Sequence, residues 1–96
     1  MPVFCVEYTY SADTARRDEV RPAHRAFLRE LSDAGVLLAS GPFTEGDPGG
    51  LLIVRADDAD AAARILDPDP YAPAGVIAAR RVRGWAQVFG PWVGGA

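Results

Sequence analysis

The stretch "VRPAHRAFLRELSDAGVLLASGPF", residues 20–43, decides the fold of this chain. Pro22 suits the first turn of a helix, and Gly35 suits the position just after a helix ends. We therefore predict an α-helix over residues 21–35, followed by a short apolar strand over residues 36–40 that the Gly41-Pro42 turn closes. Five residues of the stretch recur at helical spacing and form one stripe along the helix: Val20, His24, Phe27, Leu28 and Leu31.

Outward from this stretch, the pattern predicts three more strands and a second helix. Residues 3–10, 51–56 and 76–82 are rich in strand-forming residues, and residues 84–89 either extend the last strand or form a short additional one. Asp57 or Asp58 caps a helix that ends at Leu66, before the proline-rich residues 67–75. Residues 11–18 form a polar connection, either irregular or with a helical turn of its own. The order β-α-β-β-α-β predicts a ferredoxin-like α+β sandwich, one domain over residues 1–96 with residues 90–96 as a loose tail.

The predicted strands are apolar on both of their faces. Residues 51–54 read Leu-Leu-Ile-Val, and residues 3–6 read Val-Phe-Cys-Val, so neither strand alternates apolar with polar. Two helices can cover only one face of a four-stranded sheet, and a large exposed apolar face is rare in monomers. We therefore predict a homodimer that buries the second face, sheet against sheet.

Composition excludes several classes of protein. The chain has 96 residues, a formal net charge of −3 and 49% hydrophobic residues, and its pI of about 4.9 argues against nucleic acid or an anionic membrane as a partner. We expect no signal peptide and no membrane span. The single cysteine, Cys5, favours a cytoplasmic setting. With one histidine, one cysteine and no glycine-rich phosphate loop, we expect neither a metal nor a cofactor.

His24 is the first candidate for chemistry, because it is the one histidine of the chain and lies on a face that should pack. It is either a partly buried core histidine satisfied by one hydrogen bond or a general base at the mouth of a pocket. A base of this kind needs an acceptor that orients its second ring nitrogen. Asp69 is the best candidate for this acceptor, since Pro68 and Pro70 stiffen its backbone. Asp67 is an alternative acceptor, and either aspartate could instead simply begin a turn.

Other polar side chains are candidates for holding a substrate. Arg21 lies one turn before His24 and could bind a carboxylate or phenolate, although a solvated arginine at a helix end is the commoner interpretation. Tyr71 and Ser40 could each supply a hydroxyl group. The alternation of Arg81 and Arg83 indicates either an anion-binding strand or an edge protected by charge. We expect two tryptophans to anchor the core or a dimer rather than to carry substrate: Trp85 and Trp92.

Three motifs together resemble the YCII-related domain family. "VRPAHRAFLRELSDAGVLLASGPF" is similar to the family's R-P-x-H helix start followed by G-x-L-L-x-x-G-P. "DPYAPAGV" (residues 69–76) resembles its D-P-[FY]-x-x-A-G segment, and "RVRGW" (residues 81–85) its closing strand. The chain departs from the family in Arg25, where a leucine commonly follows the histidine, and in its doubled "DPDP".

The resemblance implies a dimeric α+β barrel with a His-Asp pair, here His24 and Asp69, in a pocket that Ser40 and the Gly41-Pro42 turn also line. Some relatives eliminate halide from hydroxylated aromatic rings, whereas others carry the domain with no known reaction. Our leading hypothesis is a cofactor-independent lyase or isomerase that acts on a small anionic or phenolic molecule, with Arg21 and Tyr71 holding its negative oxygen. The alternatives are a non-catalytic domain that binds a small molecule and a purely structural domain that forms oligomers.

Overall fold

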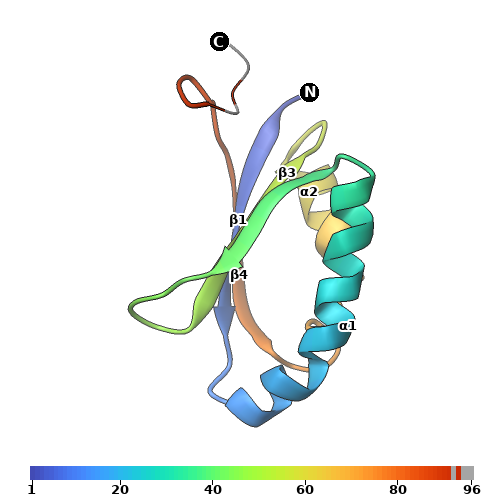
Figure 1. Ribbon diagram of the computed structural model, residues 1–96, viewed down its shortest axis with the longest axis vertical. Helices are drawn as coiled ribbons and strands as arrows, with labels where there is room; N and C mark the ends of the chain where they lie inside the picture. Colours follow the sequence, from blue (N-terminus) through green and yellow to red (C-terminus); the bar gives the residue numbers. More distant parts are fainter. Residues whose placement is uncertain (92, 94–96) are drawn as a thin grey trace.

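The computed structural model describes residues 1–91 and 93. Its elements follow the order β1 (Val3–Tyr10), α1 (Thr14–Asp33), β2 (Leu37–Pro42), β3 (Gly49–Arg55), α2 (Ala59–Leu66) and β4 (Ile77–Gly84). The strands form one antiparallel sheet in the order β2-β3-β1-β4, so each helix connects two strands that have another strand between them. This is the predicted ferredoxin-like α+β sandwich (Figure 1).

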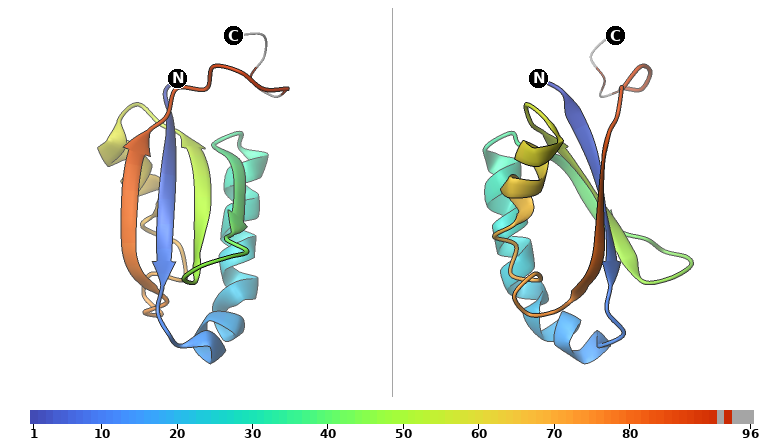
Figure 2. Two further views of the ribbon diagram at one scale, coloured as in Figure 1. Left: turned by 90° about the vertical axis from the view of Figure 1, so that its left-hand side faces the viewer. Right: turned by 180° about the vertical axis from the view of Figure 1, so that it is seen from behind.

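Both helices cover the same face of the sheet, and the core lies between the two layers (Figure 2). Residues paired across antiparallel strands point to the same side of a sheet. The pairs Phe4–Val54 and Val6–Leu52 therefore place the buried side chains of β1 and β3 together. The core cluster takes its members from β1, β2 and β3, from both helices and from the residue after β3, and Val82 of β4 packs against it: Phe4, Val6, Tyr8, Leu28, Leu37, Leu52, Val54, Ala56, Ala62 and Leu66.

Helix α1 begins at Thr14, so the predicted start near Arg21 and the predicted connection over residues 11–18 are wrong. The Asp13 side chain accepts a hydrogen bond from the backbone N–H of Arg16 at 3.0 Å and caps the helix two turns earlier. Pro22 therefore lies inside the helix, where it removes one backbone hydrogen bond without ending the helix. The burial of the stripe on α1 outweighs that single lost bond.

The predicted end of α1 is confirmed in detail. Gly35 adopts a φ of 75°, its N–H donates to the Ser32 carbonyl at 3.0 Å, and the N–H of Val36 donates to the Leu31 carbonyl at 2.9 Å. These two bonds form a Schellman motif, which satisfies the last carbonyls of the helix and needs a left-handed residue. The chain thereby reverses into β2 alongside the helix that it has just left.

Gly41 and Pro42 belong to β2 and do not form the predicted turn. Pro42 pairs with Gly50 of β3, and β2 is an edge strand of the sheet. An edge strand tolerates proline because its outer side needs no ladder hydrogen bond. The loop between β2 and β3 is consequently shorter than predicted and covers residues 43–48.

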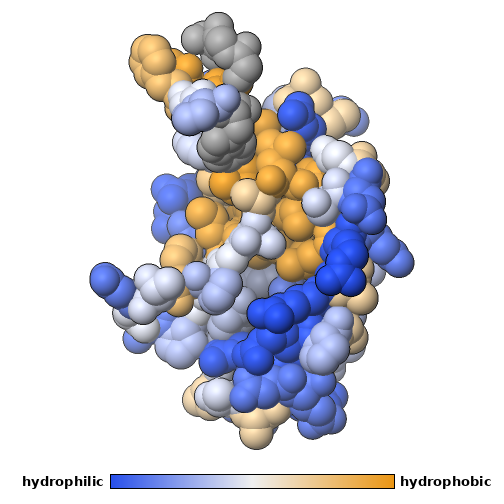
Figure 3. All heavy atoms as spheres, in the orientation of Figure 1, coloured by the Kyte–Doolittle hydropathy of each residue, from blue (hydrophilic) through white to orange (hydrophobic). Residues whose placement is uncertain are grey.

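The face of the sheet opposite the helices, which we call the open face, carries both apolar and charged residues. Cys5 pairs with Ile53 on one side and with Arg83 on the other, and Glu7 forms an ion pair with Arg83 at 3.5 Å. Figure 3 views the molecule from the β2 edge of the sheet and shows hydrophobic side chains over its upper part and hydrophilic ones over the N-terminal half of α1. The open face therefore mixes apolar and charged side chains, and its burial in a homodimer stays a prediction.

The chain beyond β4 leaves the sheet. Strand β4 ends at Gly84, although the Trp85 N–H still donates to the Val3 carbonyl at 2.9 Å, so the predicted extension over residues 84–89 covers one residue. Trp85 is 42% exposed and so does not anchor the core, whereas its alternative role as a dimer anchor stays a prediction. Trp92 lies outside the described residues. In the described part of the chain, no helix is both long and apolar enough to cross a bilayer.

Candidate functional site

Asp69 is the centre of the site. Its side chain is fully buried, and it accepts hydrogen bonds from three donors on three different segments. The Nδ1 atom of His24 lies 2.8 Å from Oδ1 and 3.0 Å from Oδ2, the Tyr8 hydroxyl donates to Oδ2 at 2.9 Å, and the Tyr71 N–H donates to Oδ1 at 3.0 Å. A buried carboxylate is tolerated only when donors compensate for its lost hydration, and these three do so.

The contacts of Asp69 also determine which nitrogen of His24 carries the hydrogen. An ionised carboxylate can only accept, so Nδ1 of the neutral imidazole must be the N–H, and Nε2 presents its lone pair. Nε2 makes no hydrogen bond to any described residue. The ring, 8% exposed, is the part of this pair that meets a cavity. The arrangement therefore can accept a proton at Nε2 while Asp69 stabilises the resulting imidazolium.

Aromatic side chains hold the imidazole in place. The Tyr71 ring stacks on the His24 ring with their centroids 3.8 Å apart and their planes at 8°, and Tyr10 meets Tyr71 edge-on at 5.8 Å. The guanidinium of Arg17 lies 4.9 Å from the centre of the Tyr10 ring, within the range of a cation–π contact. Together with the bond to Asp69, these contacts hold the imidazole ring in one orientation.

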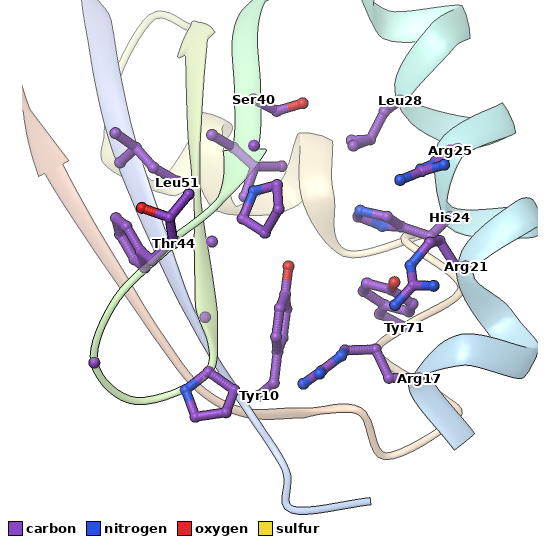
Figure 4. Close-up of a pocket in the computed structure, with 18 of the residues that line it drawn as sticks. Tyr10, Arg17, Arg21, His24, Arg25, Leu28, Ser40, Thr44, Leu51 and Tyr71 are labelled. Atoms are coloured by element: carbon purple, nitrogen blue, oxygen red, sulfur yellow. The ribbon is translucent and has the colours of Figure 1, made fainter. Parts of the chain in front are cut away.

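The cavity beside His24 has a volume of about 530 Å³, which suits a small organic ligand. It lies between the N-terminal half of α1 and the β2–β3 hairpin, with the Tyr10 hydroxyl pointing into it (Figure 4). Its lining includes charged, hydroxyl and apolar side chains: Tyr10, Arg17, Arg21, His24, Arg25, Leu28, Ser40, Pro42, Phe43, Thr44, Glu45, Pro48, Leu51, Leu52 and Tyr71, with the glycines 41, 46, 49 and 50.

The structure brings the residues predicted for the site together. Arg21, His24, Ser40, Gly41, Pro42 and Tyr71 all line the cavity, and Asp69 lies behind His24 rather than in the wall. Asp67, the alternative candidate for the partner of His24, instead forms an ion pair with Arg80 at 2.9 Å. Arg81 and Arg83 pair with β1 residues of the open face and lie away from the cavity.

Sequence reasoning missed Tyr8, Tyr10 and Arg17. The signal for Tyr8 was the alternation of β1, which puts it on the same side as Phe4 and Val6 and so towards the helix layer. Arg17 precedes Arg21 by one helical turn, and that spacing is informative only when residues 14–20 are recognised as helix. Burial raises the pKa of Tyr8, with Asp69 adding to the effect, so its phenol remains the donor to the carboxylate at neutral pH.

The two other tyrosines of the site are also protonated at neutral pH. Burial raises the pKa of Tyr10 and of Tyr71, although the nearby positive charges of Arg17 and Arg21 oppose the shift in both. Arg21 itself forms an ion pair with Asp18 at 2.6 Å. Among the residues that the structure describes, no group of three or more histidine, cysteine or acidic side chains could hold a metal ion.

Comparison with known proteins agrees with the motifs of this site. The chain matches the YCII-related domain over residues 1–86. It belongs to the YCII-related domain family. The protein YciI of Escherichia coli O6:H1 is 37% identical over 93 residues, which cover 83% of this chain and 95% of the relative, and the YciI protein of Shigella flexneri gives the same figures. His24 and Asp69 of this YCII domain both fall within the matched range.

Two solved structures share the fold of this YCII domain. The 5-chloro-2-hydroxyhydroquinone dehydrochlorinase TftG from Burkholderia phenoliruptrix AC1100, in complex with 2,5-dihydroxybenzoquinone, has a TM-score of 0.78 at 23% identity and covers 90% of this chain and 95% of its own. An antibiotic biosynthesis monooxygenase has a TM-score of 0.57 at 14% identity, with 92% of this chain and 99% of its own covered. At these identities the likeness shows the α+β fold alone.

Proposed function

We propose that this YCII domain is a cofactor-independent lyase or isomerase that acts on a small anionic or phenolic molecule. The observation that carries the proposal is the 2.8 Å contact between Nδ1 of His24 and Asp69 beside a cavity of about 530 Å³. In this role Nε2 of His24 accepts and returns a proton, and Asp69 fixes the tautomer and stabilises the imidazolium. General base catalysis of this kind contributes about 10²–10⁴-fold to the rate.

Arg21 and Tyr71 would hold the negative oxygen of the substrate. Both line the cavity next to His24, Arg21 through its guanidinium and Tyr71 through the hydroxyl end of the ring that stacks on the imidazole. A guanidinium binds a carboxylate or phenolate through two parallel N–H groups, so it can orient a flat substrate. Ser40, Gly41 and Pro42 form the opposite wall and would limit the size of the substrate.

Elimination of hydrogen chloride from a chlorinated trihydroxybenzene is the specific reaction that we propose to test, because TftG is named for it. In this reaction two hydroxyl groups of the ring lose their protons. One proton goes to the carbon that bears chlorine, the second leaves with chloride as HCl, and the ring becomes a hydroxybenzoquinone. No oxidant is consumed. A single imidazole suits the first transfer, since it can take a proton from oxygen and deliver it to carbon.

The test measures chloride release and quinone absorbance with 5-chloro-2-hydroxyhydroquinone as substrate. His24→Gln should abolish turnover in a folded protein. Asp69→Asn should lower kcat by 10²-fold or more with KM nearly unchanged, because the amide favours the wrong imidazole tautomer. Asp67→Asn is the matched control, since Asp67 is exposed and contacts only Arg80 and its own helix end. Full turnover in His24→Gln would refute the proposal.

The same variants distinguish catalysis from simple binding. If the domain only binds a small molecule, wild-type protein will release no chloride above the uncatalysed rate. Asp69→Asn will then change the affinity for 2,5-dihydroxybenzoquinone only modestly, since Asp69 does not reach the cavity wall. Such a result would replace the lyase proposal with the binding proposal.

We also propose that the protein is a cytoplasmic homodimer in which two open faces pack together. Cys5 and Ile53 would lie near the centre of that contact, and the Glu7–Arg83 ion pair would border it. Cys5 is a free cysteine, as a reducing compartment favours. Sedimentation equilibrium should give twice the chain mass of 10.2 kDa at micromolar concentration. Cys5→Arg should give the monomer, whereas Arg64→Glu on the far side of α2 should not, and a monomeric wild type would refute the dimer.

A further inference from the structure

Two arginines of the cavity have no acceptor for their guanidinium groups. The Nη1 atom of Arg17 is buried and makes no hydrogen bond to any described residue. Arg25, which is exposed, forms neither a hydrogen bond nor an ion pair within residues 1–91 and 93. A buried donor without an acceptor costs free energy, which a bound anion would recover. Arg21, between them, differs from both because one of its guanidinium nitrogens has an acceptor within the chain, Asp18 at 2.6 Å.

The acids near the cavity do not supply the missing acceptors. Asp69 is surrounded by its three donors and lies behind His24. Glu45 is the only acidic side chain among the described residues that line the cavity, and it lies on the β2–β3 loop without an ion pair to either arginine. The buried Nη1 of Arg17 therefore needs an acceptor from outside the described residues, and the exposed guanidinium of Arg25 is available to bind one.

The spacing of Arg17 and Arg25 places the two free groups on either side of the base. They are eight residues apart on α1, so their backbones are about 12 Å apart along the helix axis, and His24 lies between them in sequence. Figure 4 shows all three side chains on the helix side of the cavity, with Arg17 beside Tyr10 and Arg25 on the other side of His24. A ligand that reached both arginines would lie across the imidazole.

Tyr10 and Gly50 shape the end of the cavity at Arg17. Arg17 packs over the Tyr10 ring, which supports the guanidinium and leaves its N–H edge for a ligand. A Cβ atom at Gly50 would lie 2.7 Å from the Tyr10 hydroxyl and 3.2 Å from the Gly41 carbonyl. The absence of a side chain at Gly50 thus leaves room for the Tyr10 hydroxyl, which can donate to the same anion as Arg17.

We propose that the cavity binds a rigid, elongated dianion, with one acidic group at Arg17 and Tyr10 and the other at Arg25. This inference rests on the proposed function only in assigning the ligand to the same cavity. It identifies Arg17 and Arg25 as residues that determine specificity. Arginine suits this task better than lysine because its planar fork binds an acidic group through two hydrogen bonds, and all ten basic residues of the chain are arginines.

The experiment uses terephthalate as a dianionic probe and 4-carbamoylbenzoate as a probe of the same shape with one charge. Isothermal titration calorimetry at low salt should show at least tenfold tighter binding of terephthalate to the wild type. Arg17→Gln and Arg25→Gln should each reduce that preference to less than threefold. Arg29→Gln, one turn beyond Arg25 and outside this cavity, should keep it. Circular dichroism confirms that each variant is folded.

The outcomes separate this inference from the proposed activity. Neither probe carries a leaving group, so their affinities report the two arginines and not the chemistry of His24. His24→Gln should therefore keep the preference for terephthalate even though it releases no chloride from 5-chloro-2-hydroxyhydroquinone. Equal affinity of the wild type for the two probes, no binding of either at millimolar concentration, or a preference that survives in Arg17→Gln and Arg25→Gln would overturn the inference.

Discussion

The hydroxyl group of Tyr8 should stabilise the folded protein by an amount that a single substitution can measure. Tyr8 is 1% exposed, and its hydroxyl donates to the fully buried Asp69 at 2.9 Å. A hydrogen bond to a charged group contributes about 1.5–3 kcal/mol. In Tyr8→Phe the ring stays in the core, and Asp69 keeps the donors of His24 and Tyr71. We therefore expect a loss of about 2 kcal/mol in the free energy of unfolding.

Tyr10→Phe is the matched control for this substitution. It removes the same hydroxyl group from a tyrosine of the same strand, but the Tyr10 hydroxyl points into the cavity and bonds to no described residue. We expect a change within about 0.5 kcal/mol for Tyr10→Phe, as for most substitutions that leave no buried group unsatisfied. The difference between the two variants isolates the bond to Asp69 from the loss of a phenolic oxygen.

Urea unfolding followed by far-UV circular dichroism measures both values. The slope of free energy against urea should not change, so the whole effect should appear as a lower midpoint. In thermal unfolding, a loss of about 2 kcal/mol lowers Tm by about 8–16 °C for a domain of this size. If Tyr8→Phe and Tyr10→Phe lose equal stability, or if Tyr8→Phe loses less than 0.5 kcal/mol by this measure, then the carboxylate of Asp69 does not depend on Tyr8 and the geometry of the site is wrong.

Three further predictions follow from single groups. Gly35→Ala should lower the free energy of unfolding by about 1 kcal/mol, because an alanine is strained at the φ of 75° that Gly35 adopts. Gly41→Ala is the control and should leave the free energy of unfolding unchanged, because Gly41 has no positive φ and open space around it. Equal urea midpoints for the two variants would contradict this prediction. Burial within the single chain raises the pKa of Cys5. At a protein concentration low enough to give the monomer, the alkylation of Cys5 by iodoacetamide should therefore reach half its maximal rate above about pH 8.5, and a midpoint at or below that of free cysteine argues against it. Because the pKa of Tyr8 is raised in the folded protein, the unfolded chain loses the phenolic proton at a lower pH than the folded chain does. The free energy of unfolding should therefore fall as the pH rises beyond about 10, and it should fall less steeply in Tyr8→Phe. Identical slopes of this free energy against pH in the two proteins would rule the prediction out.

The fold, and His24 and Asp69 as separate candidates, could be predicted from the sequence because each depends on a local rule, whereas the pairing of the two residues came from the family resemblance. The stripe that contains His24 follows helical periodicity, and the end of α1 follows the need for a left-handed residue at Gly35. Asp69 was recognisable because two prolines restrict it. Each of these features depends on residues that are close in sequence, but the contact between His24 and Asp69 joins positions 45 residues apart and is a tertiary property.

The start of α1 and the edge of the cavity could not be predicted in the same way. At Pro22 the preference of proline for the first turn competes with capping at Asp13, and the packing of the whole helix decided in favour of Asp13. Tyr10 and Arg17 contribute because β1 ends where α1 begins, so one short connection brings them together. Their proximity is a tertiary property, and it became visible only when the helix was known to begin at Thr14.

Asp69 supports the base and the packing of the domain, whereas the cavity wall contacts the ligand, and this separation lets the ligand change while the fold stays the same. Asp69 bonds to β1 through Tyr8, to α1 through His24 and to its own loop through the Tyr71 N–H, so it connects the segments whose packing forms the domain. Changes at Asp69 must therefore affect stability as well as proton transfer. Arg17 and Arg25 reach the cavity from one helix face and contact none of these three bonds. Substitutions there can alter the ligand while the base and its support stay intact, and this is why we assign specificity to the arginines and proton transfer to the buried pair.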